Sequence, residues 1–228
     1  MISKNFARCL AKISGDGNLY YRYIRYSNTS RILLQEFKED IRKVFGNVKF
    51  TEGKVNSGTP FIQIHGKAII GEFKKYMKSY KSDDIIVPDV IMNGSKAIQR
   101  EYLRAFYDDE GSPNLRLFKV TKEWKRNINL CSNSIRLLKD IKILLLESFG
   151  IETNRIFKNK NNDDYDRSFV LSVTGKDNFI KFKECVGFKI PYKQEKLDLM
   201  IKSYGNTFSR NREGFDKIKE KLGSCSQC

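Results

Sequence analysis

The stretch Cys9-Leu10-Ala11-Lys12-Ile13-Ser14-Gly15-Asp16-Gly17 decides the fold, because a stretch of the same kind stands 94 residues later: Leu103-Arg104-Ala105-Phe106-Tyr107-Asp108-Asp109-Glu110-Gly111. Each is a helix-like run that closes with a carboxylate and then a glycine. Two more pairs follow in the same order, since residues 27–47 resemble 132–151 and residues 64–77 resemble 173–186. The offset between the copies grows from 94 to 104 and 109 residues, so we expect longer hairpins in the second copy.

The spacing of apolar residues predicts which elements each copy contains. Leu34, Phe37, Ile41 and Phe45 follow the 3.6-residue spacing of an amphipathic helix, as do their counterparts in the second copy. Strand-like runs cover residues 19–26, 47–54, 59–64, 114–120, 124–131, 153–158 and 167–173. Each copy therefore predicts the order helix, hairpin, helix, hairpin, helix. The predicted class is α+β, with two pseudo-twofold-related αββαββα repeats.

The repeats divide the chain into four predicted parts. These are an N-terminal repeat (1–78), a linker (79–95), a C-terminal repeat with one extra helix (96–204), and a loosely held polar tail (205–228). Small residues at positions 7, 11, 14 and 15 form a smooth ridge on the first helix, and Ala105 matches Ala11 in the second copy. We therefore expect the two motif helices to pack against each other at the centre.

The composition indicates a folded protein with a polyanionic partner. The 228 residues include 43 Lys and Arg against 27 Asp and Glu, for a net charge of +16, together with 16 Phe, 11 Tyr and one Trp. This excess favours nucleic acid as the partner, and a membrane surface is the other polyanion to consider. No apolar run is long enough to span a bilayer, no secretory signal is recognisable, and five scattered cysteines are typical of reduced thiols. We therefore expect an intracellular protein with no membrane partner.

Paired acids are the strongest candidates for chemistry. Asp16 and Glu110 each end a helix, where the macrodipole disfavours a carboxylate, and they would repel one another if the helices pack. A divalent cation between the two carboxylates offsets this repulsion. Such an ion can also activate water for phosphodiester cleavage. The predicted metal set is Asp16 and Glu110 with the preceding residues Gly15 and Asp109. His65 is the only histidine, so a site built on several histidines is excluded.

Basic and amide side chains follow the predicted strands. Alternation places every second side chain on one face of a sheet, and Arg, Lys, Gln and Asn are residues that contact phosphates and base edges. The predicted DNA-binding residues are Arg22, Arg25, Lys49, Lys54, Gln63, Arg116, Lys119, Lys125, Arg126, Asn129, Arg155, Lys158 and Arg167.

With these features the chain resembles a single-chain LAGLIDADG homing endonuclease, whose two nine-residue motifs correspond to residues 9–17 and 103–111. The GDG and EG endings most resemble the archaeal intron-encoded branch. The resemblance implies two saddle-shaped antiparallel sheets astride DNA, with the metal-binding acids at Asp16 and Glu110. It also implies a Mg²⁺-dependent (or Mn²⁺-dependent) staggered double-strand break with 3′ overhangs in a long, pseudo-palindromic site. A monomer in a prokaryotic cytoplasm, archaeal by preference, or in an organellar matrix is expected.

The chain departs from the family pattern at Lys12 and Arg104 within the motifs, and Pro113 stands just past the second motif, where the resemblance implies lysine in a relative. The basic or polar residue that assists the attacking water is therefore open, with Lys119, Lys122, Arg25 and Asn133 as candidates. Alternative functions are an RNA maturase acting on an intron, a non-catalytic DNA-binding protein, and a nuclease using Asp109 or Glu110 with Glu123-Trp124-Lys125. The terminal Cys225-Ser226-Gln227-Cys228 has zinc-like spacing but provides only half a site.

Overall fold

The computed structural model describes residues 2–77, 83–158 and 168–225. The elements in chain order are α1 (Lys4–Ser14), β1 (Gly17–Leu19), β2 (Tyr23–Ser27), α2 (Arg31–Phe45), β3 (Phe50–Lys54), β4 (Pro60–His65), α3 (Lys67–Tyr76), α4 (Asp89–Met92), α5 (Lys96–Glu110), β5 (Gly111–Phe118), β6 (Glu123–Ser132), α6 (Ile135–Phe149), β7 (Phe157–Lys158), β8 (Phe169–Val173), α7 (Lys176–Cys185), α8 (Pro191–Lys202) and α9 (Arg212–Cys225). This order confirms the predicted α+β class with repeated αββαββα units.

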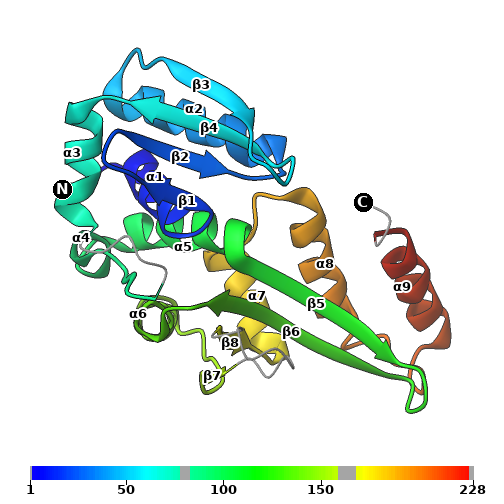
Figure 1. The fold of residues 1–228 in the computed structure, drawn as a ribbon. Coiled ribbons are helices and arrows are strands. Elements are labelled where there is room, and N and C mark those ends of the chain that lie inside the picture. Colours follow the sequence, from blue (N-terminus) through cyan, green and yellow to red (C-terminus); the bar gives the residue numbers. More distant parts are fainter. Residues whose placement is uncertain (1, 78–82, 159–167, 226–228) are drawn as a thin grey trace.

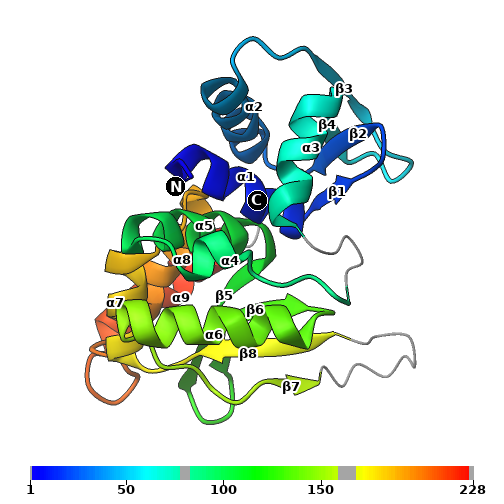
Figure 2. The ribbon, with the colours of Figure 1, turned by 90° about the vertical axis from the view of Figure 1, so that its left-hand side faces the viewer.

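Two four-stranded antiparallel sheets have the same topology. The first has the order β1-β2-β4-β3 and the second the order β5-β6-β8-β7. In both views the sheets lie on either side of the central α1–α5 pair (Figures 1 and 2). The second copy has the longer first hairpin, as the growing offset predicted: β5 and β6 pair from Gly111↔Leu130 to Phe118↔Glu123, whereas β1 and β2 share three pairs.

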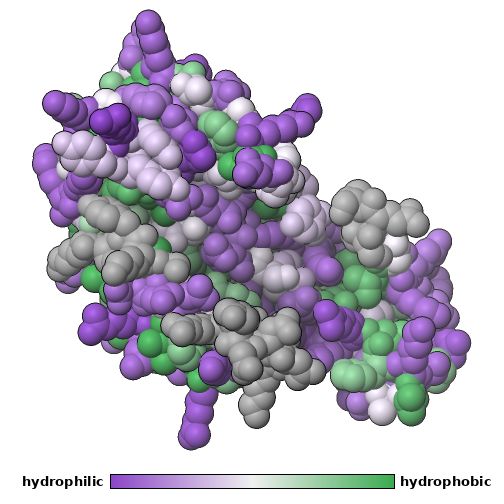
Figure 3. All heavy atoms as spheres, in the orientation of Figure 1, coloured by the Kyte–Doolittle hydropathy of each residue, from purple (hydrophilic) through white to green (hydrophobic). Residues whose placement is uncertain are grey.

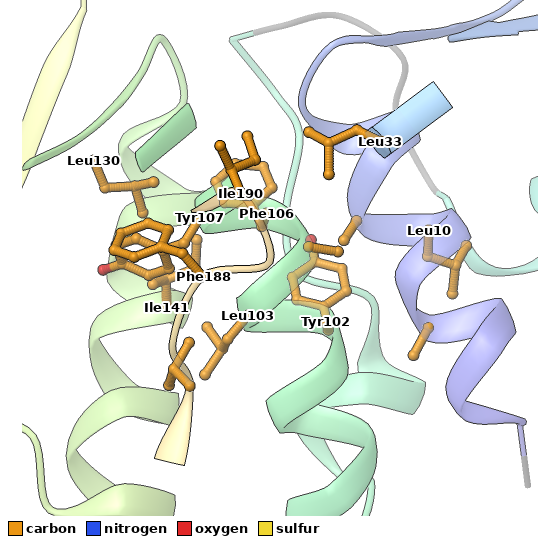
Figure 4. Packing of buried hydrophobic residues seen from close by; sticks show 14 of the residues in the cluster. Leu10, Leu33, Tyr102, Leu103, Phe106, Tyr107, Leu130, Ile141, Phe188 and Ile190 are labelled. Atoms are coloured by element: carbon orange, nitrogen blue, oxygen red, sulfur yellow. The ribbon is translucent and has the colours of Figure 1, made fainter. Parts of the chain in front are cut away.

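The central helices pack closely because their facing residues are small. Ala7 and Ala11 on α1 and Ala105 on α5 are fully buried, and the two helices are in extensive contact. Larger side chains of α5 fill the space on both sides (Figure 4): Tyr102 lies toward Leu10, and Tyr107 lies toward the second repeat. The described residues thus share one hydrophobic core that runs through both repeats.

The predicted polar tail from residue 205 is corrected by the structure. Residues 212–225 form α9, and its Phe215 and Ile218 are buried. The Phe215 ring lies 5.1 Å from that of Trp124 on β6, whose indole donates to the carbonyl of Asn206 at 3.3 Å. The contact between Phe215 and Trp124 removes apolar surface from water, which favours the folding back of this segment onto the long hairpin. The boundaries predicted at residues 78 and 95 stay predictions.

Candidate nuclease site and nucleic-acid interface

The two motif acids stand at adjacent ends of the packed helices. α1 ends at Ser14 and α5 at Glu110, and after each helix the chain turns directly into the first strand of the corresponding sheet. A Cβ at Gly15 would lie 3.2 Å from the Cβ of Asp109, so glycine permits this approach of the two helix ends. Asp16 and Glu110 line the same cleft of about 630 Å³. The structure therefore brings together Gly15, Asp16, Asp109 and Glu110.

Hydrogen bonds fix two of these acids from the first repeat. Asn28 Nδ2 donates to Asp16 Oδ2 at 2.7 Å, and the hydroxyl of Tyr26 donates to Asp109 Oδ1 at 2.6 Å. Asp109 Oδ2 is buried and accepts no hydrogen bond within the described parts of the chain. An unpartnered buried carboxylate oxygen is costly unless a cation or donor approaches it.

Burial and mutual repulsion make these acids hard to ionise. Burial raises the pKa of Asp109 to about 8, and the neighbouring Asp16 and Glu110 carboxylates contribute to that rise, against the opposing effect of Lys12. The pKa of Glu110 rises to about 7 through burial and the Asp16 charge. The pKa of Asp16 is also raised, mainly by burial. Close carboxylates with raised pKa values cluster at functional sites, and a cation placed beside them would favour their ionised form.

Lys193 on α8 is a site residue that sequence reasoning missed. This buried side chain donates from Nζ to the carbonyl of Asp108 at 2.5 Å and approaches that of Tyr107 at 3.4 Å. Burial lowers its pKa, while the charges of Asp108, Asp109, Asp16 and Glu110 oppose that shift. Lys193 therefore neutralises the carbonyl end of α5 and part of the acid charge. Because α8 has no counterpart in the first repeat, comparison of the two repeats could not identify Lys193.

Asp108 has a structural role, although it belongs to the second motif. Its carboxylate accepts from the backbone amides of Lys189 and Ile190 at 2.9 and 3.2 Å, directly before α8 begins at Pro191. Burial raises the pKa of Asp108 to about 6, although these amides counteract the shift. The carboxylate thereby fixes the start of α8 and with it the position of Lys193.

The departures Lys12 and Arg104 belong to a buried ion-pair cluster behind the acids. Lys12 is fully buried and lies 3.2 Å from Glu36 on α2. Arg104 and Lys189 of the second repeat lie 3.7 and 3.2 Å from the same carboxylate. Burial alone would raise the pKa of Glu36, but these three cations lower it.

Arg8 extends the cluster across the helix interface. It pairs with Asp40 on α2 and, at 2.5 Å, with Glu101 on α5. Glu101 also accepts from Arg104 at 2.7 Å. The two repeats are thus joined by charges as well as by small residues.

Of the candidates for assisting the water, Asn133 lines the cleft with Asp16 and Glu110. Lys119 and Lys122 lie at the hairpin tip, on the order of 25 Å from Gly111 along a strand that rises about 3.3 Å per residue. They are therefore wrong for this role. Arg25 is engaged with Gln63 on the sheet.

The alternative arrangement with Glu123 and Lys125 is likewise not formed. Glu123 pairs with Phe118 at the outer end of the hairpin, far from Asp109 and Glu110.

Within the described ranges no group of three or more Asp, Glu, Cys or His side chains is arranged to hold a metal ion. The site nevertheless fits a divalent cation that takes few protein ligands. Asp16 and Glu110 contribute one carboxylate from each helix, and Asp109 offers its unpartnered oxygen. Mg²⁺ typically binds one or two carboxylates and completes its shell with water and substrate phosphates. The side chain of Cys225 and all of Cys228 lie outside the described residues, so their predicted half-site has no structural description.

The outward faces of both sheets are polar (Figure 3). In the first sheet Ile24, Tyr26, Ile62 and Ile64 point to the core, so Arg25 and Gln63 share the opposite face. In the second sheet Leu115, Ile128 and Leu130 point inward. This leaves Arg116, Lys125 and Asn129 on the outward face, together with the unpredicted Asn114 and Asn127. Strand parity, counted from the apolar residues, could have identified these two amides.

Most other predicted DNA-binding residues are exposed around these faces: Arg22, Lys49, Lys54, Lys119, Arg155 and Lys158. Arg167 lies outside the described residues.

Arg126 differs from the other predicted DNA-binding residues of β6, because it shares the inward parity of Trp124 and Ile128. Its Nε donates to Ser203 Oγ at 2.6 Å and its Nη2 to the Ser203 carbonyl at 3.0 Å. Its guanidinium lies 4.1 Å from the Tyr204 ring. Arg126 therefore fastens the end of α8 to the hairpin.

Comparison with known proteins agrees with this geometry. Residues 97–187 match the LAGLIDADG-like domain family. The structure of mesophilic variants of the homing endonuclease I-DmoI superposes with a TM-score of 0.60 at 15% identity, over 86% of this chain and 97% of that chain. The homing endonuclease I-WcaI bound to its DNA recognition sequence superposes with a TM-score of 0.56 at 16% identity, over 86% of this chain and 87% of that chain. The chain has the LAGLIDADG homing endonuclease fold.

Two sequence relatives are from Methanocaldococcus jannaschii. A glutamine–fructose-6-phosphate aminotransferase is 24% identical over 195 residues, covering 83% of this chain and 17% of that protein. A probable translation initiation factor IF-2 is 26% identical over 198 residues, covering 85% and 15%. The chain thus spans about a sixth of the length of these relatives. The two relatives have different names, and the matching segment is a small part of each. Within the described ranges, no helix is long and apolar enough to span a membrane.

Proposed function

We propose that this protein is a site-specific endonuclease that makes a staggered double-strand break, with 3′ overhangs, in a long pseudo-palindromic DNA. The observation that carries the proposal is the meeting of Asp16 and Glu110 at the ends of two packed helices, between two sheets with polar outward faces. Each sheet would cover one half of the duplex, and the acids would lie between the two halves. The net charge of +16 supports binding of a polyanion.

The chain's own residues supply the positioning that this reaction needs. Asn28 holds the carboxylate of Asp16, and Tyr26 holds that of Asp109. Lys193 offsets part of the negative charge that accumulates beside the scissile phosphates. When bound, a Mg²⁺ or Mn²⁺ ion would activate water and stabilise the leaving oxygen. I-DmoI has been crystallised with DNA and Mn and, as a variant, with its target DNA in the presence of Mg, which supports the choice of ion.

The experiment compares wild type with Asp16→Asn and Glu110→Gln on DNA from the uninterrupted allele of the gene that surrounds this reading frame. Both substitutions keep the shape of the side chain and remove its charge. We expect only wild type to cut in Mg²⁺, while all three proteins bind the DNA with similar affinity. The matched control is Glu147→Gln on α6, an exposed glutamate that should leave cleavage unchanged.

End mapping decides between the functions. Paired nicks offset toward 3′ overhangs support the proposal. Tight binding without any break in Mg²⁺ or Mn²⁺ would refute the nuclease and favour a DNA-binding role, or a maturase if unspliced intron RNA is bound and spliced. Equal loss of binding and cutting in both variants would show that the acids are structural. The archaeal origin of the relatives supports an archaeal host.

A further inference from the structure

Three polar side chains on the outward face of the first sheet form one hydrogen-bonded unit. Arg25 on β2 donates from Nε and Nη2 to Oε1 of Gln63 on β4, at 3.1 and 2.8 Å. The Nε2 atom of Gln63 lies 2.8 Å from Nε2 of His65, two residues further along the same strand. None of the three belongs to the acid site.

The guanidinium determines how the protons are arranged in this unit. The Nε–H and Nη2–H groups of Arg25 both point at Gln63 Oε1. If the Gln63 amide were rotated to exchange its oxygen and nitrogen, its NH₂ group would face these N–H donors. The Gln63 amide nitrogen therefore faces His65. An amide NH₂ donates and does not accept, so Nε2 of His65 is the acceptor and the imidazole proton is on Nδ1.

Packing holds the arginine in place before any ligand arrives. Its guanidinium lies 4.3 Å from the Phe61 ring and 5.1 Å from the Tyr23 ring. Phe61 in turn lies against Gly53 of β3, where a Cβ would come within 2.8 Å of the ring. Gln63 is only 9% exposed, so the amide that orients Arg25 is itself held by its surroundings. Little side-chain entropy remains to be lost on binding.

The donors left free on Arg25 define what the unit can recognise. With Oε1 of Gln63 occupied, the unit presents the remaining guanidinium N–H groups. Guanine is the base that shows two acceptors, N7 and O6, on its major-groove edge, and arginine binds them as a bidentate pair. Adenine and cytosine each present an amino donor there, which would oppose the guanidinium.

The second repeat has a different pair at the same place. The offsets of 104 and 109 residues put Asn129 opposite Arg25 and Ser172 opposite Gln63, and the two are paired across β6 and β8 in the same way. Ser172 donates to Asn129 Oδ1 at 2.7 Å. The counterpart of His65 is Thr174, whose hydroxyl donates to Asn154 instead. The second sheet therefore has no positively charged side chain among these three matching residues.

We infer that Arg25, positioned by Gln63, His65 and Phe61, reads one guanine in the half-site under the first sheet, and that the pseudo-symmetric position of the other half-site is read differently. The DNA target is then asymmetric at this pair of positions. The inference rests on the proposed function only in requiring site-specific DNA binding.

The test is selection of bound duplexes from a randomised library in EDTA, so that no cleavage intervenes. We expect wild type to select a guanine at one position of the first half-site. The pseudo-symmetric position of the other half-site should not show the same preference for guanine. Replacing that base should weaken binding about 10- to 100-fold, the range that one bidentate arginine contact provides. Arg25→Lys should lose this preference and keep the others.

Variants of the neighbours separate positioning from stability. Gln63→Ala and His65→Ala should weaken the preference at the same position only, with thermal melting unchanged within a few degrees. The double variant Arg25→Asn with Gln63→Ser copies the second repeat and should remove the asymmetry. The matched control Arg116→Lys should leave the guanine unaffected.

Two outcomes would overturn the inference in different ways. Selection of a defined site whose guanines are unchanged in Arg25→Lys, or symmetric in the two halves, would refute it while the proposed function stands. Selection of no defined site by wild type would refute both.

Discussion

Arg126 and Lys125 are neighbours on β6 with opposite predicted effects, which makes them a sharp test of the sheet geometry. Truncation of Arg126 to alanine removes its donors to the buried Ser203 and its contact with the Tyr204 ring. Two acceptors of Ser203 then lose their partner, at about 1 kcal/mol each, and the lost cation–π contact adds about 0.5–1 kcal/mol. We expect Arg126→Ala to lower the free energy of unfolding by about 2–4 kcal/mol.

Lys125→Ala is the matched control, because the side chain is exposed on the outward face. We expect its stability to stay within about 0.5 kcal/mol of wild type. If it contacts a phosphate, the slope of log affinity against log salt becomes shallower by about 0.9. Arg126→Ala should leave that slope unchanged.

Urea unfolding measures the stability, and fluorescence anisotropy with labelled duplex between about 50 and 200 mM salt measures the slope. The assignment of faces would be refuted by the reverse pattern, in which Arg126→Ala unfolds like wild type but has a shallower salt slope.

Three further outcomes are expected. Without divalent ions, folded Asp109 and Glu110 retain protons up to about pH 8 and 7, whereas unfolded carboxyls release them near pH 4. The folded state therefore binds more protons between these values, and stability falls as the pH rises. Mg²⁺ should raise the melting temperature more at pH 8 than at pH 5.5, and this difference between the two pH values should be smaller in Glu110→Gln. An equal rise in melting temperature at both pH values would contradict this. Lys193→Met should lower stability by about 1–3 kcal/mol and slow cleavage, since two α5 carbonyls lose their donor; unchanged unfolding and single-turnover rates would count against it. Phe215→Ala should destabilise α9 by about 3–5 kcal/mol, seen as faster amide hydrogen exchange in residues 212–225 while α5 stays protected; uniform exchange changes would argue that α9 is integral to the core.

The repeat pattern predicted the fold and the acid pair because both depend on local order along the chain. Helix periodicity and the glycines after Asp16 and Glu110 are visible in the sequence. The inward direction of Arg126 is also visible there, since it alternates with Trp124 and Ile128, but its charge favours the opposite interpretation.

The remaining site residues depend on contacts between distant segments. Lys193 is more than 80 residues from Glu110, on a helix without a repeat counterpart. Lys12 is fully buried beside Glu36 of another helix, a contact that the order of residues along the chain does not show. The aromatic residues of α9 stand in a polar stretch, and the Trp124 ring that they cover belongs to a distant hairpin, so the sequence alone predicts a tail.

The ion-pair cluster behind the acids determines which repeat can pack against which. Arg8 pairs with Glu101, but the repeat offset of 94 residues puts Tyr102 at the position of Arg8 and Ala7 at that of Glu101. Two copies of the first repeat would therefore place Arg8 opposite no carboxylate on the other helix. Each half of this chain is now complementary to the other and unable to replace it, so a homodimer of either half would lose the charge pairing that joins them.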